Sequence, residues 1–134
     1  MTAEILSIGA YVPEKVVTNE ELSKTVDTND EWIRSHTGIG QRHIIAEGQT
    51  TSDMAVEAAK IALERANTTA EEIDLILLAT ATGDYPGVPS TACVVQHKLG
   101  IRHTAALDIS AGCSGFVYGL EMARNFIIAG GATK

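Results

Sequence analysis

The chain has 134 residues, 45% of them hydrophobic and 20% charged, which suits one globular domain or part of a larger one. Its formal net charge of -7 and its lack of a basic stripe exclude a general nucleic-acid binder, because neutralising phosphates requires concentrated Lys and Arg. No stretch predicts a membrane span or a signal peptide, and the cysteines have neither disulfide nor metal spacing, so we expect a reduced, cytoplasmic protein without a metal.

The N-terminal third predicts a strand, two short helices and an extended piece. The strand is expected at residues 3–12, the first helix from residue 18, the second helix from residue 28 to about 38, and the extended piece at 41–46. Both helices are predicted from Ser/Thr-x-x-Glu capping boxes that begin at Thr18 and Thr28. Gly38 is expected to end the second helix, which carries Trp32.

The remaining sequence alternates helices and strands. We expect a helix from Thr50 or Thr51 to about Ala66, a half-turn at 69–72, a strand at 74–79, a loop at 80–89, a helix at 90–99, a strand at 104–109 and a helix from Cys113 to about Ala129. One face of the first helix is rich in alanine, which allows close packing. The strand at 74–79 is almost wholly apolar, as in strands covered on both faces. This alternation predicts an α/β fold with at least partly parallel pairing.

The last predicted helix is interrupted only by Glu121, Arg124 and Asn125, so we expect it to be largely buried. Residues 130–134 follow, where a further strand would be expected in a protein of this kind. The sequence therefore reads as an incomplete domain at 1–134.

Cys113 is the strongest candidate for chemistry. It is predicted to lie in the first turn of a helix that follows a strand, where free N–H groups and the helix dipole favour a thiolate. Gly112 and Gly115 leave room beside the sulfur for a reacting group. The pattern indicates a nucleophile that receives an acyl group, although an inert core cysteine fits it as well.

Other residues carry weaker signals. Cys93 and His97 lie four apart on a predicted helix, but we expect Cys93 in the core and His97 half exposed. Trp32 is either a packing residue or a flat ring that stacks on a base, with Arg34, His36 and Arg42 nearby for phosphates. The loop at 80–89 is either a connection or the wall of a pocket.

Four separate motifs together resemble one family. They are Asp30-Glu-Trp-Ile33 with Thr37-Gly-Ile39 and Arg42-His43, then Pro89-Ser90 through Cys93, then Asp108 through Gly115. In this order and spacing they are similar to β-ketoacyl-acyl-carrier-protein synthase III, a condensing enzyme of the thiolase superfamily. The resemblance runs along the whole chain and covers the N-terminal portion of that enzyme, somewhat less than half.

The resemblance implies a thiolase-like layered αβαβα fold, of which this chain would be the N-terminal half, and a homodimeric full-length enzyme. An acyl-CoA would acylate Cys113, and decarboxylative Claisen condensation with malonyl-acyl carrier protein would then give β-ketoacyl-carrier protein, CoA and CO2. CoA thioester is the substrate, and no separate cofactor, nucleic acid or membrane is implied. The family's catalytic His and Asn lie in the C-terminal half, so this chain alone is not expected to complete the condensation.

The resemblance also implies binding residues. Trp32 matches the position that stacks on the CoA adenine, Thr28 contacts the same nucleotide, and Val88 lies in the loop that lines the acyl pocket. The sequence departs from the family at His36 and Gly40, where basic residues are frequent, which puts phosphate contacts there in doubt. Two alternatives stay open: a related condensing enzyme of secondary metabolism, and a non-catalytic acyl-CoA-binding fragment or subunit.

Overall fold

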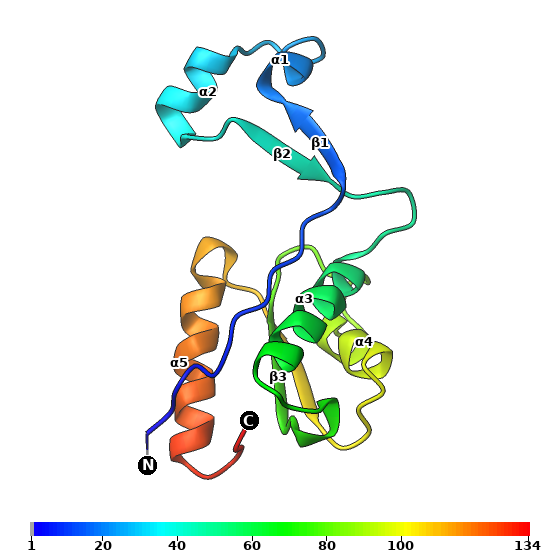
Figure 1. Ribbon diagram of the computed structural model, residues 1–134, viewed down its shortest axis with the longest axis vertical. Coiled ribbons are helices and arrows are strands. Elements are labelled where there is room, and N and C mark those ends of the chain that lie inside the picture. The colour runs from blue at the N-terminus through cyan, green and yellow to red at the C-terminus, as the bar shows by residue number, and fades with distance from the viewer. Residues whose placement is uncertain (1) are drawn as a thin grey trace. The chain divides into compact units, whose positions relative to one another are not determined.

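The computed structural model describes residues 2–134, which divide into two compact units (Figure 1). The small unit is Val12–Gln49. The large unit combines the residues before Val12 with Thr50–Lys134. Within residues 2–134, no helix has the length and apolar character needed to cross a membrane.

The small unit is a two-stranded antiparallel sheet with two short helices. Its elements are β1 (Lys15–Thr18), α1 (Asn19–Leu22), α2 (Asp30–Thr37) and β2 (Gln41–Ile44). The capping box at Thr18 is confirmed, since its hydroxyl accepts from the Glu21 N–H while the Glu21 carboxylate accepts from the Thr18 N–H. Gly38 ends α2 with a φ of 74°, also as predicted.

The predicted start of α2 was wrong by one residue. Asn29, not Thr28, is the N-cap, and its side-chain oxygen accepts from the Trp32 N–H at 2.8 Å. Both residue types are good caps, so the backbone geometry decides between them. The Thr28 hydroxyl therefore does not cap α2.

The large unit is a layered α/β structure. It contains α3 (Thr51–Arg65), the 3-10 turn η1 (Ala70–Glu72), β3 (Leu75–Ala79), α4 (Thr91–Lys98), β4 (Ala105–Ile109), the 3-10 turn η2 (Gly112–Ser114) and α5 (Gly115–Ile128). The strands β3 and β4 pair in parallel, as predicted, with Leu75 opposite Ala105. Figure 1 shows α5 on one side of this sheet and α3 and α4 on the other.

Two of the predicted helix starts in the large unit are confirmed, those of α3 and α4. Thr50 and Asp53 form a capping box at α3, and Ser90 caps α4 through the Cys93 N–H. Residues 80–89 form the expected loop, and Gly100 follows α4 with a φ of 76°. Each of these signals depends on residues within one turn of one another, which is why the sequence carries them.

The strand predicted at residues 3–12 is not formed. A strand needs a neighbouring strand to bond its N–H and C=O groups, and no strand among residues 2–134 pairs with this segment. It runs instead along α3, where the Ser7 hydroxyl donates to the Ala62 carbonyl at 2.7 Å and Arg65 donates to the Ile8 carbonyl at 2.6 Å. The alanine-rich face of α3 allows this close approach.

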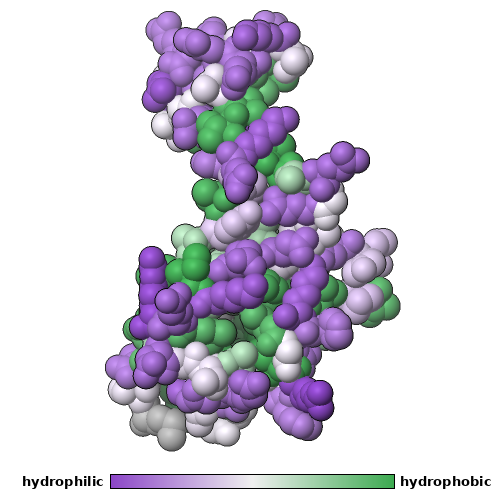
Figure 2. All heavy atoms as spheres, turned by 45° about the vertical axis from the view of Figure 1, so that its right-hand side comes forward, coloured by the Kyte–Doolittle hydropathy of each residue, from purple (hydrophilic) through white to green (hydrophobic). Residues whose placement is uncertain are grey.

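The expectation that the last helix is largely buried was also wrong. Gly115 is the only buried residue of α5, while Phe116 is 71% and Val117 64% exposed. The helix packs on β3 with one side, and several of its large apolar side chains elsewhere are exposed. The space-filling view shows hydrophobic residues at the surface among hydrophilic ones (Figure 2).

Close contact between the N-terminal segment and α3 predicts a cost for any side chain at Gly9. A Cβ atom there would lie 2.1 Å from the Ala58 carbonyl oxygen and 2.6 Å from the Ala62 nitrogen. We expect Gly9→Ala to lower the free energy of unfolding by about 1–3 kcal/mol, measured by urea denaturation. Gly119→Ala is the matched control, because its Cβ would meet a single atom of Ile109 at 3.5 Å; destabilisation by both changes alike would contradict the prediction.

The α3 cap predicts a defined acid sensitivity. The Lys98 ammonium, together with Thr50, lowers the pKa of Asp53 from 3.8 to about 2. A lowered pKa stabilises the folded state above pH 3.8, and this stabilisation is lost as the pH falls from there to about 2. We expect Asp53→Asn to flatten that part of the pH–stability curve in thermal unfolding, whereas Glu64→Gln on the exposed side of α3 leaves it unchanged.

Candidate active site

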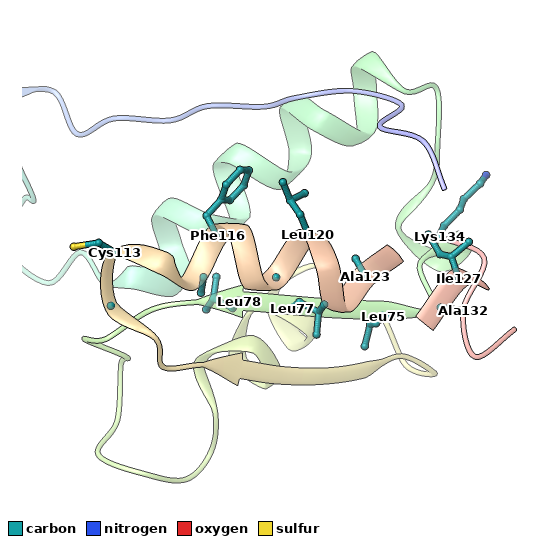
Figure 3. A pocket seen from close by; sticks show the side chains of 13 residues that line it. Leu75, Leu77, Leu78, Cys113, Phe116, Leu120, Ala123, Ile127, Ala132 and Lys134 are labelled. Atoms are coloured by element: carbon teal, nitrogen blue, oxygen red, sulfur yellow. The ribbon is translucent and has the colours of Figure 1, made fainter. Parts of the chain in front are cut away.

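Cys113 lies in η2, between the end of β4 and the start of α5. It precedes the helix, which corrects the prediction that it occupies the first helical turn. The reason is the tighter 3-10 geometry, in which Ser114 donates to the Ala111 carbonyl and Gly115 to the Gly112 carbonyl. The thiol is exposed and points away from the end of α5 (Figure 3).

Two glycines shape the turn at Cys113. Gly112 has a φ of 51°, a left-handed conformation that strains other residues. A Cβ on Gly115 would lie 3.1 Å from the Ala79 Cβ, so glycine lets α5 begin close to the end of β3. Cys113 therefore stands where two parallel strands end, the usual place for a ligand in open α/β sheets.

An apolar groove of about 570 Å³ lies between β3 and α5, with Cys113 at one end and Lys134 at the other (Figure 3). Leu75, Leu77, Phe116 and Leu120 are among its lining residues. An exposed thiol beside apolar walls can receive a reactive carbonyl while the hydrocarbon part of the ligand avoids water. Val88 is 88% exposed and does not line this groove.

Hydrogen bonds that the sequence analysis missed anchor the loop before α4. The Asp108 carboxylate accepts from the Thr91 and Ala92 N–H groups, both at 2.7 Å. The buried Thr91 hydroxyl accepts from the Asp84 N–H at 2.9 Å, and the Asp84 carboxylate accepts from the N–H and hydroxyl of buried Ser52. Burial raises the pKa of Asp84, but the hydrogen bonds from Ser52 outweigh it and hold the pKa below its ordinary value.

In the small unit, Thr28 and Trp32 lie at the same cavity. With Asp27 and Asn29 they line a cavity of about 180 Å³. Trp32 is 55% exposed. The Thr28 hydroxyl is buried without a hydrogen-bond partner in the described part of the chain.

The basic residues near Trp32 are largely engaged by the protein. The Arg34 Nε lies 2.9 Å from the Asp30 Oδ2. The Arg34 guanidinium also lies against Gly40, where an added Cβ would be 2.7 Å from the Arg34 Nη2. The hydrogen bond from Asn19, supported by Arg34, lowers the pKa of Asp30. His36 stacks on Trp32, with ring centroids 4.4 Å apart.

Cys93 is exposed, which corrects its expected place in the core. The buried residues of α4 are Thr91, Ala92 and Val95, whereas Cys93 stays exposed although its sulfur lies 3.7 Å from the Ala106 carbonyl of β4. The Ser90 hydroxyl donates to its sulfur at 3.1 Å. His97 is exposed as well. Among residues 2–134, no group of three or more His, Cys, Asp or Glu side chains is arranged to hold a metal ion.

Comparisons with known proteins give a consistent family. The protein-family model for 3-oxoacyl-[acyl-carrier-protein] synthase III matches residues 107–134 of this chain. A β-ketoacyl-[acyl-carrier-protein] synthase III from Sulfurovum sp. is 57% identical over 128 residues, which are 96% of this chain and 38% of that protein.

Solved structures agree. The Aquifex aeolicus 3-oxoacyl-[acyl-carrier-protein] synthase III superposes with a TM-score of 0.89 at 50% identity, over 95% of this chain and 41% of that one. The priming β-ketosynthase of the R1128 polyketide pathway has a TM-score of 0.89 at 33% identity, over 96% of this chain and 38% of that one. The chain thus spans about two fifths of the length of the relatives it matches.

The fold and the matched structures show the class of protein: the chain has the thiolase-like α/β fold of condensing enzymes, as predicted. Within that class, the resemblance to the β-ketoacyl-[acyl-carrier-protein] synthase III family is confirmed over nearly every residue of the chain. The comparisons leave the roles of Cys113, Thr28, Trp32 and Val88 as predictions.

Asn19 holds the helix that carries Trp32, and its loss is expected to destabilise the small unit. Its buried side chain donates to Asp30 at 2.7 Å and to the Ile39 carbonyl at 2.8 Å, and it accepts from Arg42 at 2.5 Å. Asn19→Ala removes all three hydrogen bonds from a buried position, so we expect a loss of about 1–3 kcal/mol in unfolding free energy. Asn125→Ala, at an exposed asparagine of α5, should stay within about 0.5 kcal/mol; equal losses would contradict this role.

Proposed function

We propose that this chain is the acyl-accepting part of a β-ketoacyl-acyl-carrier-protein synthase III, which starts fatty-acid synthesis. The observation that carries the proposal is the exposed Cys113 thiol, held between a parallel strand and a helix at the end of an apolar groove. The family resemblance over 96% of the chain supports it. The full reaction, its substrates and its partners are part of the proposal, because the chain spans about two fifths of its relatives.

In the first step, the Cys113 thiolate attacks the thioester carbonyl of an acyl-CoA. The new carbon–sulfur bond forms as the bond to CoA breaks, and CoA leaves as a thiolate that takes up a proton. The Cys113 N–H is a donor for the negative charge that develops on the carbonyl oxygen. In the second step, malonyl-acyl carrier protein loses CO2, and its carbanion attacks the acyl-cysteine to give β-ketoacyl-carrier protein and free Cys113.

Trp32 and Thr28 would hold the nucleotide of CoA. The half-exposed indole is suited to stack on adenine, while the Thr28 hydroxyl is buried, so its assignment to the same nucleotide is supported by the family resemblance. Val88 lies outside the apolar groove at Cys113, so its proposed place in the acyl pocket is supported by the family resemblance alone. The proposal further includes a cytoplasmic location, a homodimeric full-length enzyme and no cofactor besides the CoA thioester.

A condensing enzyme of secondary metabolism is the second candidate. The likeness to the R1128 priming β-ketosynthase, at a TM-score of 0.89, favours it. It shares the acylation of Cys113 and differs in the partner that receives the acyl group. A non-catalytic acyl-CoA-binding module would never form the covalent thioester.

Incubation with acetyl-CoA, followed by intact-mass spectrometry, tests the acylation. We expect one acetyl adduct on the wild-type chain and on Cys93→Ala, and none on Cys113→Ala. Cys93 is the matched control, since both thiols are exposed and only Cys113 is proposed to be a nucleophile. An adduct that survives Cys113→Ala, or no adduct on any form, would overturn the proposal.

Adding malonyl-acyl carrier protein to the acetylated chain should yield no β-ketoacyl product. The residues to which we assign roles accept the acyl group and bind CoA, and none is assigned to decarboxylation. Detection of a β-ketoacyl product by mass spectrometry would contradict the proposal that this chain accepts the acyl group but does not complete the condensation.

A further inference from the structure

One side of α5 carries a regular apolar stripe. Its members are four, three and four residues apart, which is the spacing at which two helices pack along a common seam: Phe116, Leu120, Ala123 and Ile127. All of them line the groove against β3, and Figure 3 shows Phe116 and Leu120 projecting side by side from the helix. Phe116 is 71% and Leu120 43% exposed. We call these four residues the α5 stripe, and their pattern is typical of a helix that packs against another helix.

The chain exposes more surface than is expected for compact units of its length. Its accessible surface is 9224 Å². Two separate compact units as long as the small and the large unit would together expose about 8,000 Å². The excess of about 1,000 Å² is larger than the roughly 800 Å² that each partner buries in an ordinary specific interface. Exposed apolar side chains of α5 contribute to this excess, so the chain has surface enough for one further interface that includes α5.

The sizes of the stripe residues favour an antiparallel pairing of two α5 helices. In a parallel, in-register pair, each Phe116 would meet the other Phe116, and the two Ala123 side chains would leave a gap between them. In an antiparallel pair centred between Leu120 and Ala123, these two residues lie opposite each other, and Phe116 lies opposite an isoleucine. Each larger side chain then faces a smaller one, which fills the seam. Such a pair is two-fold symmetric, so both copies use the same patch and the interface closes on itself.

No member of the α5 stripe is charged. Elsewhere on α5, Glu121 and Arg124 pair with each other at 3.4 Å within one copy, so neither requires a partner from a second copy. The chain as a whole carries a formal net charge of -7, which repels a second copy and is screened by salt. Association through the stripe should therefore become stronger as salt is added, whereas association held by ion pairs would become weaker.

We propose that the α5 stripe is an interface at which two copies of this chain associate, with their α5 helices antiparallel about a two-fold axis. The inference goes beyond the proposed function and is separate from the homodimer proposed for the full-length enzyme. Acetylation of Cys113 tests the proposed function independently. We expect a dimer with a dissociation constant of about 1–50 µM, because the contact is apolar and of ordinary size.

Sedimentation velocity of the 134-residue chain tests the interface. The wild type should form dimers, and they should be tighter in about 0.5 M than in about 0.05 M NaCl. Phe116→Glu should weaken the dimer at least about tenfold, since it puts an unpaired charge into the seam. Tyr118→Glu is the matched control, because Tyr118 is a 57% exposed aromatic residue of the same helix outside the stripe, and it should dimerise as the wild type does. Circular dichroism should show equal helix content in all three forms.

Three results of this experiment would overturn the proposal. They are a wild type that stays monomeric up to about 200 µM, which would leave the stripe to a different polypeptide or a small ligand, a Phe116→Glu variant that dimerises as tightly as the wild type, and association that continues beyond a dimer.

A distance measurement tests the antiparallel arrangement. Cys93→Ala leaves Cys113 as the single thiol for a spin label, and Cys113 lies just before α5. In the antiparallel pair the two labels stand at opposite ends of the seam, about 25 Å or more apart at a rise of 1.5 Å per residue. A parallel pair would bring them within about 15 Å. A short distance by pulsed electron paramagnetic resonance would therefore overturn the proposed pairing.

Discussion

The Asp108 carboxylate is the contact on which the large unit depends most. It lies near the end of β4 and accepts two N–H groups at the start of α4, where the helix dipole favours a negative charge. The hydroxyl of Thr91, the first residue of α4, continues the chain of hydrogen bonds to Asp84, and the Asp84 carboxylate binds Ser52 at the start of α3. Because the polar groups of this network all find partners within it, the strand end, both helix starts and the loop between them are held in one arrangement.

That arrangement determines where Cys113 stands. The chain leaves the anchored end of β4 through Gly112, whose left-handed backbone turns it toward α5, and Gly115 allows the helix to begin against Ala79. The thiol is thus set at the surface by backbone geometry. In the small unit, Asn19 hydrogen-bonds both to Asp30 at the start of α2 and to Arg42 of β2. These bonds hold α2, the helix that carries Trp32, against the sheet. In both units a buried polar group supports an exposed residue to which we assign chemistry.

The sequence predicted those elements that local contacts define. The capping box at Thr18, the helix start at Thr50 and the stop at Gly38 were confirmed, since each depends on residues within about one turn. The expected strand at 3–12 and the expected burial of α5 were wrong, because pairing and coverage depend on partners distant in sequence. Cys93 was misplaced for a related reason: α4 has apolar residues on more than one side, and periodicity does not say which side packs.

Residue order alone therefore led to the parallel α/β class, the strand–turn–helix around Cys113 and the family, because hydrogen bonds between near neighbours and short motifs carry that information. Only the folded chain showed that the Thr28 hydroxyl is buried without a partner among residues 2–134, that His36 stacks on Trp32 and that Asp84 accepts from Ser52. The motif around Cys113 indicated a reactive cysteine, and the fold showed its thiol at the protein surface. Burial, stacking and long-range hydrogen bonds arise when separate segments meet, and no local pattern of residues specifies which segments do so.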